Sequence, residues 1–161
     1  MTKVISAPGD RVVSTSDGVD VRFAGLELTS DIPGHVQVRP GERGIKISLE
    51  AIRGHETGLR DHSYDQARLQ WAERRRTDGA ESAGPMPTMP GVLAFEPVEL
   101  QITDDSGTDY RFVAGQVAGD GTEWSASWTY LPEPPRHVKC LNLVGTLHGA
   151  PTGKSCKIQL D

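Results

Sequence analysis

The sequence predicts an all-β fold, a sandwich of two antiparallel sheets. Apolar and polar residues alternate in three stretches, 45–51, 98–102 and 124–130, which is the pattern of strands with one buried and one solvated face. The chain also contains 18 glycines and 11 prolines, which suit the many tight turns of a β fold. Together these observations favour a sandwich over a helical bundle.

Length and charge limit the classes of protein further. The 161 residues, of which 36% are hydrophobic, fit a single domain covering 1–161 with room for a sizeable core. The net charge of −5 argues against partners such as nucleic acid or an anionic membrane. No leader-like segment or long apolar run is present, and two cysteines do not form a disulfide framework. We therefore expect a cytoplasmic protein.

The first third of the chain reads as short strands followed by one long strand. Strands are expected at 3–6 and 11–16, and a longer one begins at Val19. Beyond Gly25 its apolar residues change parity, which predicts a β-bulge at that glycine. A short strand around 36–38 and a longer one at 45–51 should follow.

The stretch from Arg53 to Pro90 interrupts the β pattern. It is rich in Arg, Asp, Glu, Gly and Pro, and so long a departure from a compact sandwich is typically functional or disordered. Ser63 and Gln66 resemble a capping box and begin a segment of helical spacing, which predicts a short helix of about three turns. Residues 79–90 read as an extended linker.

The β pattern returns at Val92 and continues to the end, giving nine or ten strands in total. A hairpin turn at 149–153 would place Cys156 opposite Gly145, and Cys140 would then lie roughly 16 Å away along the partner strand. A disulfide needs Cα atoms within about 7 Å, so both thiols are expected to be free.

The second half of the chain carries a family resemblance. The segment 103–110 contains a D-D-x-G-x-x-Y hairpin, and it is followed by Trp124, the prolines of 132–135 and a strand with Leu141 and Leu143. In these features the chain resembles uncharacterised bacterial immunoglobulin-like sandwich domains. The resemblance implies an immunoglobulin-like fold and transfers no catalytic residue.

Carboxylates gather in two neighbouring turns and could bind Ca²⁺ through their oxygens. The alternative is turn chemistry, because Asp side chains bond the local backbone and Gly adopts positive φ; we favour this reading and expect no cofactor. No phosphate-binding loop, zinc motif or serine-nucleophile elbow is present. The candidate metal ligands are Asp104, Asp105, Asp109 and Asp120.

Two classes of function remain open. The first is a non-catalytic protein-interaction module that contacts another protein, possibly a second copy of itself, through a sheet edge or the 53–90 excursion. The second is a small hydrolase or a metal- or ligand-binding sandwich with its site at the Asp-rich turns. The excursion could also simply cap the open end of the sandwich and bury its tryptophan there. The interface candidates are Tyr64, Arg68, Trp71 and Arg75.

Overall fold

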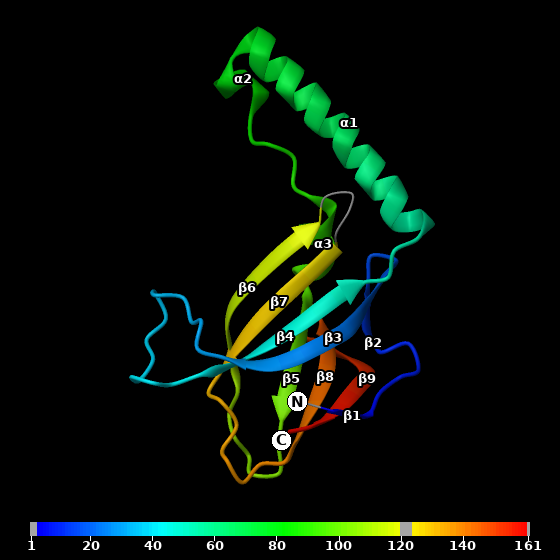
Figure 1. The fold of residues 1–161 in the computed structure, drawn as a ribbon. Coiled ribbons are helices and arrows are strands. Elements are labelled where there is room, and N and C mark those ends of the chain that lie inside the picture. The colour runs from blue at the N-terminus through cyan, green and yellow to red at the C-terminus, as the bar shows by residue number, and fades with distance from the viewer. Residues whose placement is uncertain (1–2, 120–123, 161) are drawn as a thin grey trace.

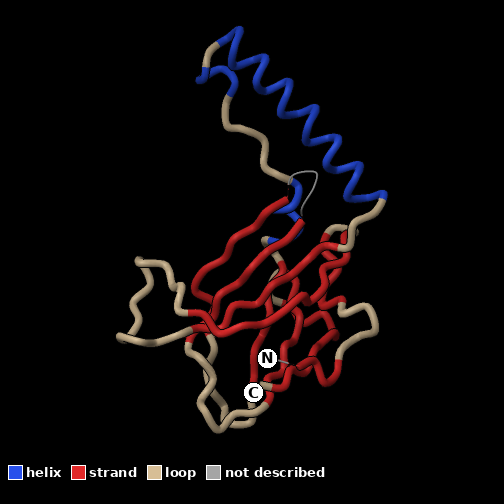
Figure 2. Tube along the Cα trace, viewed as in Figure 1, coloured by secondary structure: helices blue, strands red, loops and turns tan. Residues whose placement is uncertain are grey.

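The computed structural model describes residues 3–119 and 124–160. Two antiparallel sheets pack face to face, as the sequence predicts, and a helical segment stands away from them (Figures 1 and 2). The four-stranded sheet has the order β1-β9-β8-β5 and the five-stranded sheet the order β2-β3-β4-β7-β6. The two sheets therefore form an all-β sandwich.

The elements have the following bounds. The four-stranded sheet consists of β1 (Lys3–Ser6), β5 (Val98–Thr103), β8 (Cys140–Leu147) and β9 (Ala150–Gln159). The five-stranded sheet consists of β2 (Val12–Ser16), β3 (Val19–Thr29), β4 (Gly44–Ala51), β6 (Arg111–Gly119) and β7 (Trp124–Leu131). The helices are α1 (His55–Asp78), α2 (Ala80–Ala83) and α3 (Pro90–Phe95).

The core fills the space between the sheets with the inward residues of each alternating strand. Ile47 and Leu49 of β4 face Leu141 and Leu143 of β8 across this space, and all four side chains are fully buried. Phe95 of α3 is also fully buried and closes one end of the core. The burial of such side chains is the main source of the stability of the fold.

The bulge predicted at Gly25 is present. Phe23 pairs with Leu49 of β4, whereas Gly25 pairs with the adjacent residue Ser48, so one residue of β3 is extra at this point. The extra residue restores the buried face, and Leu26 enters the core. The change of parity at Gly25 thus predicts the position of this bulge correctly.

Three local predictions are wrong. Residues 36–38 lie in the loop between β3 and β4, which pair directly with each other. Val92 belongs to α3 rather than to a strand, because Pro90 is favourably placed in the first turn of a helix. The last hairpin turns at His148 and Gly149, whose φ angles are 50° and 81°. Positive φ at both positions is the geometry of a two-residue hairpin turn.

This shorter turn changes the register around the cysteines. Cys156 pairs with Leu143 rather than with Gly145, and Cys140 pairs with Gln159. Both cysteines are free thiols. Cys156 is buried, and this burial raises the pKa of its thiol, so the side chain behaves as a small apolar core residue.

The outer edge of β5 is covered by two aromatic side chains from the opposite sheet. The indole Nε1 of Trp128 donates a hydrogen bond to the carbonyl oxygen of Val98 at 2.8 Å. The backbone N–H of Leu100 donates to the hydroxyl oxygen of Tyr130 at 3.1 Å. Since an uncovered edge strand invites pairing with another chain, these two bonds make β5 a poor site for strand addition.

The two sheets approach each other closely at Gly145 of β8. A β-carbon added there would overlap the backbone carbonyl oxygen of Val13 in β2. The same oxygen accepts a hydrogen bond from the hydroxyl of Thr152 at 2.6 Å. The backbones are therefore fixed at a distance that only glycine permits.

We expect Gly145→Ala to destabilise the fold by about 1–3 kcal/mol, because the added methyl group forces two backbones apart. Gly25→Ala is the matched control, since a β-carbon at this other strand glycine meets no atom within 4 Å. Urea unfolding of the two variants measures the difference. Equal midpoints for the two would contradict the close approach.

Candidate protein interface on the helical arm

The 53–90 excursion forms a helical arm, defined here as residues 55–89, that projects from one end of the sandwich (Figure 1). Its main element, α1, has 24 residues, which corresponds to a length of about 36 Å. The prediction of about three turns beginning near Ser63 is wrong in both length and starting point. A short helix in the predicted linker, α2, packs against α1 near the tip of the arm.

The start of α1 is set by Gly54 and Thr57. The backbone N–H of Gly54 donates to the hydroxyl oxygen of Thr57 at 2.9 Å, and that hydroxyl donates to the carbonyl oxygen of Gly54 at 3.0 Å. Thr57 is itself buried. These bonds satisfy backbone groups that a helix terminus otherwise leaves without partners, so the helix begins two turns before Ser63.

The base of the arm is joined to the sandwich through Asp61. The Asp61 side chain accepts a hydrogen bond from the indole Nε1 of Trp124 at 3.0 Å and forms an ion pair with Arg53 at 3.0 Å. The guanidinium of Arg53 also lies over the indole ring of Trp124, 5.8 Å from its centroid. Asp61 is only 7% exposed, and a buried carboxylate requires such partners.

Arg60, on the neighbouring position of α1, makes a second connection. Its guanidinium forms an ion pair with Asp17 in the β2–β3 turn at 2.8 Å, and it also donates to the carbonyl oxygen of Asp17. Partial burial would lower the pKa of Arg60, but its bonds to Asp17 and Glu56 outweigh this effect and raise it. Consecutive residues of the helix thus bind two different parts of the sandwich.

Nearer the tip, Trp71 holds the arm together rather than packing on the sandwich. Its indole Nε1 donates to the carbonyl oxygen of Gly84, just after α2, at 3.0 Å. The guanidinium of Arg75 lies 5.4 Å from the centroid of the Trp71 ring. The alternative in which the helix caps the sandwich by burying Trp71 against it therefore does not describe this structure.

The predicted interface residues fall on one face of α1. Tyr64, Arg68, Trp71 and Arg75 follow the spacing i, i+4, i+7, i+11, which places residues on successive turns of the same side. The two arginines are exposed, and the two aromatic residues are half-buried. Leu69 on another face is 65% exposed, and nothing in the alternation or charge pattern singles it out.

At the opposite end of the sandwich, Asp104 organises the turn between β5 and β6. Its carboxylate accepts hydrogen bonds from the backbone N–H groups of Ser106 at 2.8 Å and Thr108 at 3.2 Å, and from the hydroxyl of Tyr110 at 2.6 Å. This is the turn chemistry expected of an aspartate beside glycine. The carboxylate is engaged by the chain itself.

The four candidate metal ligands are not brought together as a set in the described structure. Asp105 and Asp109 are exposed, Asp104 is held in its turn, and Asp120 lies outside the described residues. Within 3–119 and 124–160, no group of three or more His, Cys, Asp or Glu side chains is placed to hold a metal ion.

The Asp104 turn also contacts the loop before β8. The hydroxyl of Ser106 and the Nε2 atom of His137 lie 2.6 Å apart, and both side chains are exposed. Serine beside histidine is the arrangement that activates a nucleophile when a third group orients the ring. Within residues 3–119 and 124–160, the side-chain partner of His137 is Ser106, so we interpret the pair as a contact that joins the two loops.

Comparison of the chain with protein families, with curated proteins and with solved structures finds no match. Within the described residues, the helices lack the combination of length and apolar character that a membrane crossing requires.

We expect Asp61→Ala to lower the free energy of unfolding by about 1–3 kcal/mol, because it leaves the indole N–H of Trp124 buried without an acceptor. Asp61→Asn retains an acceptor and should cost less. Asp65→Asn, at an exposed position one turn later on α1, is the control and should stay within about 0.5 kcal/mol of the parent protein. Urea unfolding followed by Trp fluorescence measures all three, and equal effects of Asp61→Ala and Asp65→Asn would contradict the anchoring role.

A second prediction concerns the stability of the fold at low pH. Partial burial would raise the pKa of Asp104, but the hydrogen bonds from Tyr110, Thr108 and Ser106 dominate and lower it from 3.8 to about 2. A folded-state pKa below the unfolded value means that this contribution to stability is complete above the unfolded pKa and is lost as the pH falls toward 2. The melting temperature of Asp104→Asn should therefore lie below that of the parent at pH 7 and approach it below pH 4.

The control for this experiment is Asp105→Asn, because Asp105 is the exposed neighbour in the same turn. A plot of its melting temperature against pH should stay parallel to that of the parent across the same range. If the melting temperature of Asp104→Asn also ran parallel to that of the parent, the Asp104 carboxylate would not be stabilising the turn.

Proposed function

We propose that this chain is a non-catalytic protein-interaction module and that the helical arm is its contact surface. The observation that carries the proposal is the contrast between the two ends of α1. Only Thr57 and Asp61 of its 24 residues are buried, and both lie in the first two turns. The remaining length is held out from the sandwich (Figure 2), where it contributes nothing to the core.

Stability alone gives no reason for this length. Among the other elements, α1 contacts chiefly α2, and the bond from Trp71 to Gly84 near the tip lies within the arm itself. A shorter connection between β4 and α3 would close the sandwich as well, and a doubling of loop length changes the closure cost by only about 0.6 kcal/mol. An ordered and anchored projection of this kind is better explained by a contact that it makes elsewhere.

The surface of the arm carries residue types that are common in protein contacts. Leu69 and Met86 are 65% and 50% exposed, and the arginines at 68, 74 and 75 surround Trp71 in the sequence. Arginine and large apolar side chains are common anchors of interfaces. The β5 edge is a weaker candidate than the arm, because Trp128 and Tyr130 bond to it.

The alternative function, a small hydrolase at the Asp-rich turns, rests on the contact between Ser106 and His137. Both residues are exposed, whereas a nucleophile and base usually act in a site that excludes water. The interaction module is therefore the better supported of the two.

The proposal predicts a position-dependent crosslink. A photoreactive phenylalanine analogue placed at Leu69 should crosslink a defined partner, or a second copy of the chain, in cells that express the protein. The same analogue at Lys157, an exposed position on β9, should not form this product. Products at both positions, or at neither, would contradict an interface on the arm.

Charge reversal supplies the second control. Arg74→Glu combined with Arg76→Glu should remove the Leu69 crosslink, because Arg74 lines the same surface depression as Leu69. The melting temperature should stay within a few degrees of the parent's, since both side chains are exposed. Lys154→Glu combined with Lys157→Glu reverses the same number of charges on β9 and should leave the crosslink intact. If the β9 pair abolished the crosslink equally, the effect would come from net charge and not from the arm.

A further inference from the structure

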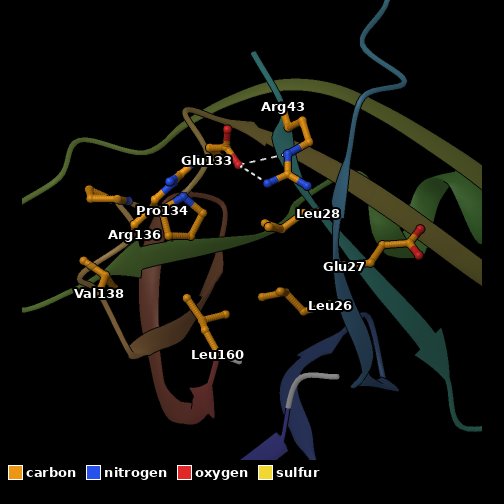
Figure 3. A pocket seen from close by; sticks show the side chains of 10 residues that line it. Leu26, Glu27, Leu28, Arg43, Glu133, Pro134, Arg136, Val138 and Leu160 are labelled. Carbon is orange, nitrogen blue, oxygen red and sulfur yellow. Dashed lines mark hydrogen bonds and ion pairs between the residues drawn. The ribbon is translucent and has the colours of Figure 1, made fainter. Parts of the chain in front are cut away.

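A groove lies at the end of the sandwich away from the arm, with a volume of about 630 Å³. Leu26 and Leu28 of β3 form one wall, and Val138 and Leu160 lie opposite them (Figure 3). Leu26 and Val138 are buried, whereas Leu28 is 40% exposed. The volume is in the range of small-molecule sites, which are typically 300–1,000 Å³ and mostly apolar.

The walls of the groove are held in place by bonds outside it. The backbone N–H of Val138 donates to the carbonyl oxygen of Pro135 at 2.9 Å, and that of Leu160 donates to Lys139 at 2.7 Å. The contact between Ser106 and His137 joins the same loop to the Asp104 turn. Pro134 and Pro135 further restrict the loop, because proline fixes φ. The groove is therefore preformed.

The charged groups at the rim of the groove differ in whether they form ion pairs. Arg43 is paired with Glu133 at 2.8 Å, and Figure 3 shows this pair at one end of the groove. Glu27 points away and pairs with Lys46 at 3.8 Å. Arg136 is exposed on the wall that contains Pro134 and Pro135, and it forms no ion pair with another described residue. Among the described residues, the rim therefore carries one positive charge beyond its two ion pairs, in a chain whose net charge is −5.

We propose that this groove binds a small molecule with an aliphatic body and a single carboxylate. The hydrocarbon would lie against Leu26, Leu28 and Val138, where its transfer from water is favourable. The carboxylate would lie at the rim beside Arg136, whose planar guanidinium suits a carboxylate. Because the arm is at the other end of the molecule, this site is independent of the proposed protein interface.

The test uses the full chain and three probes: decanoate below its micelle concentration, decyltrimethylammonium of the same chain length, and acetate. Calorimetry should show decanoate binding with a stoichiometry of one, at least about tenfold tighter than the cation. Acetate should not bind measurably, because it lacks the aliphatic body. Amide shifts in an NMR titration should concentrate at Leu28, Val138 and Leu160.

Two variants locate the site. Leu28→Glu places a carboxylate on the apolar wall and should abolish decanoate binding, whereas Arg136→Glu should weaken it at least about fivefold. Arg76→Glu, an exposed arginine at the tip of the arm, is the matched control and should bind as the parent does. Arg136→Glu keeps the test valid if Leu28→Glu fails to fold, since Arg136 is exposed.

Several results would overturn the proposal. These are no binding of decanoate to the parent chain, equal affinity for decanoate and its cationic analogue, or equal affinity of Arg136→Glu and Arg76→Glu. Shifts confined to the helical arm would place the site elsewhere and would also reject it.

Discussion

The buried contact between Asp61 and Trp124 determines how the arm relates to the rest of the molecule. Trp124 begins β7 with its ring in the core, and its indole N–H meets the carboxylate of Asp61 at 3.0 Å. The ion pair with Arg53 balances the negative charge of this buried carboxylate. The Arg53 side chain is 40% exposed, so one partner of the pair stays in contact with water. Such a pair loses less solvation than a fully buried one, so it can fix the direction of the helix at moderate cost.

The consequence is a separation of roles along the molecule. One end of the sandwich bears the anchor and the arm, while the other bears the Asp104 turn, the proline-rich loop and the groove (Figures 1 and 3). Both ends are positioned by single aspartates that accept several hydrogen bonds, Asp61 at the arm and Asp104 at the turn. The sheets between them are fixed by contacts such as that of Gly145 with β2, so a disturbance at one end need not reach the other.

The sequence predicts the sheets well because their signal is local. Alternation marks which residues of β4, β5 and β7 are buried, and Gly25 marks the bulge. The length of α1 escaped prediction because its polar residues surround it on all sides, which removes the periodicity by which a helix is recognised. Asp61 and Leu69 were not predicted for a related reason. The role of Asp61 depends on its contact with Trp124, and that of Leu69 depends on the direction of the helix. A local sequence pattern contains neither. The turn at 148–149 escaped because a nearby glycine and proline suggested a longer loop.

The polarity of α1 also bears on why it is helical at all. An isolated helix without an apolar face is marginal in water, and ion pairs such as Arg60 with Glu56 or Arg76 with Glu73 contribute only about 0.2–0.5 kcal/mol each. The anchored first turns of α1 remove the cost of helix nucleation at that end. Near the other end of α1, the hydrogen bond from Trp71 to Gly84 holds α2 against the helix. Between these two supports the helix has little to hold it except its own backbone bonds. A partner that covers Leu69 and its neighbours would add the packing energy that the arm lacks, which makes the arm the part of the chain with most to gain from binding.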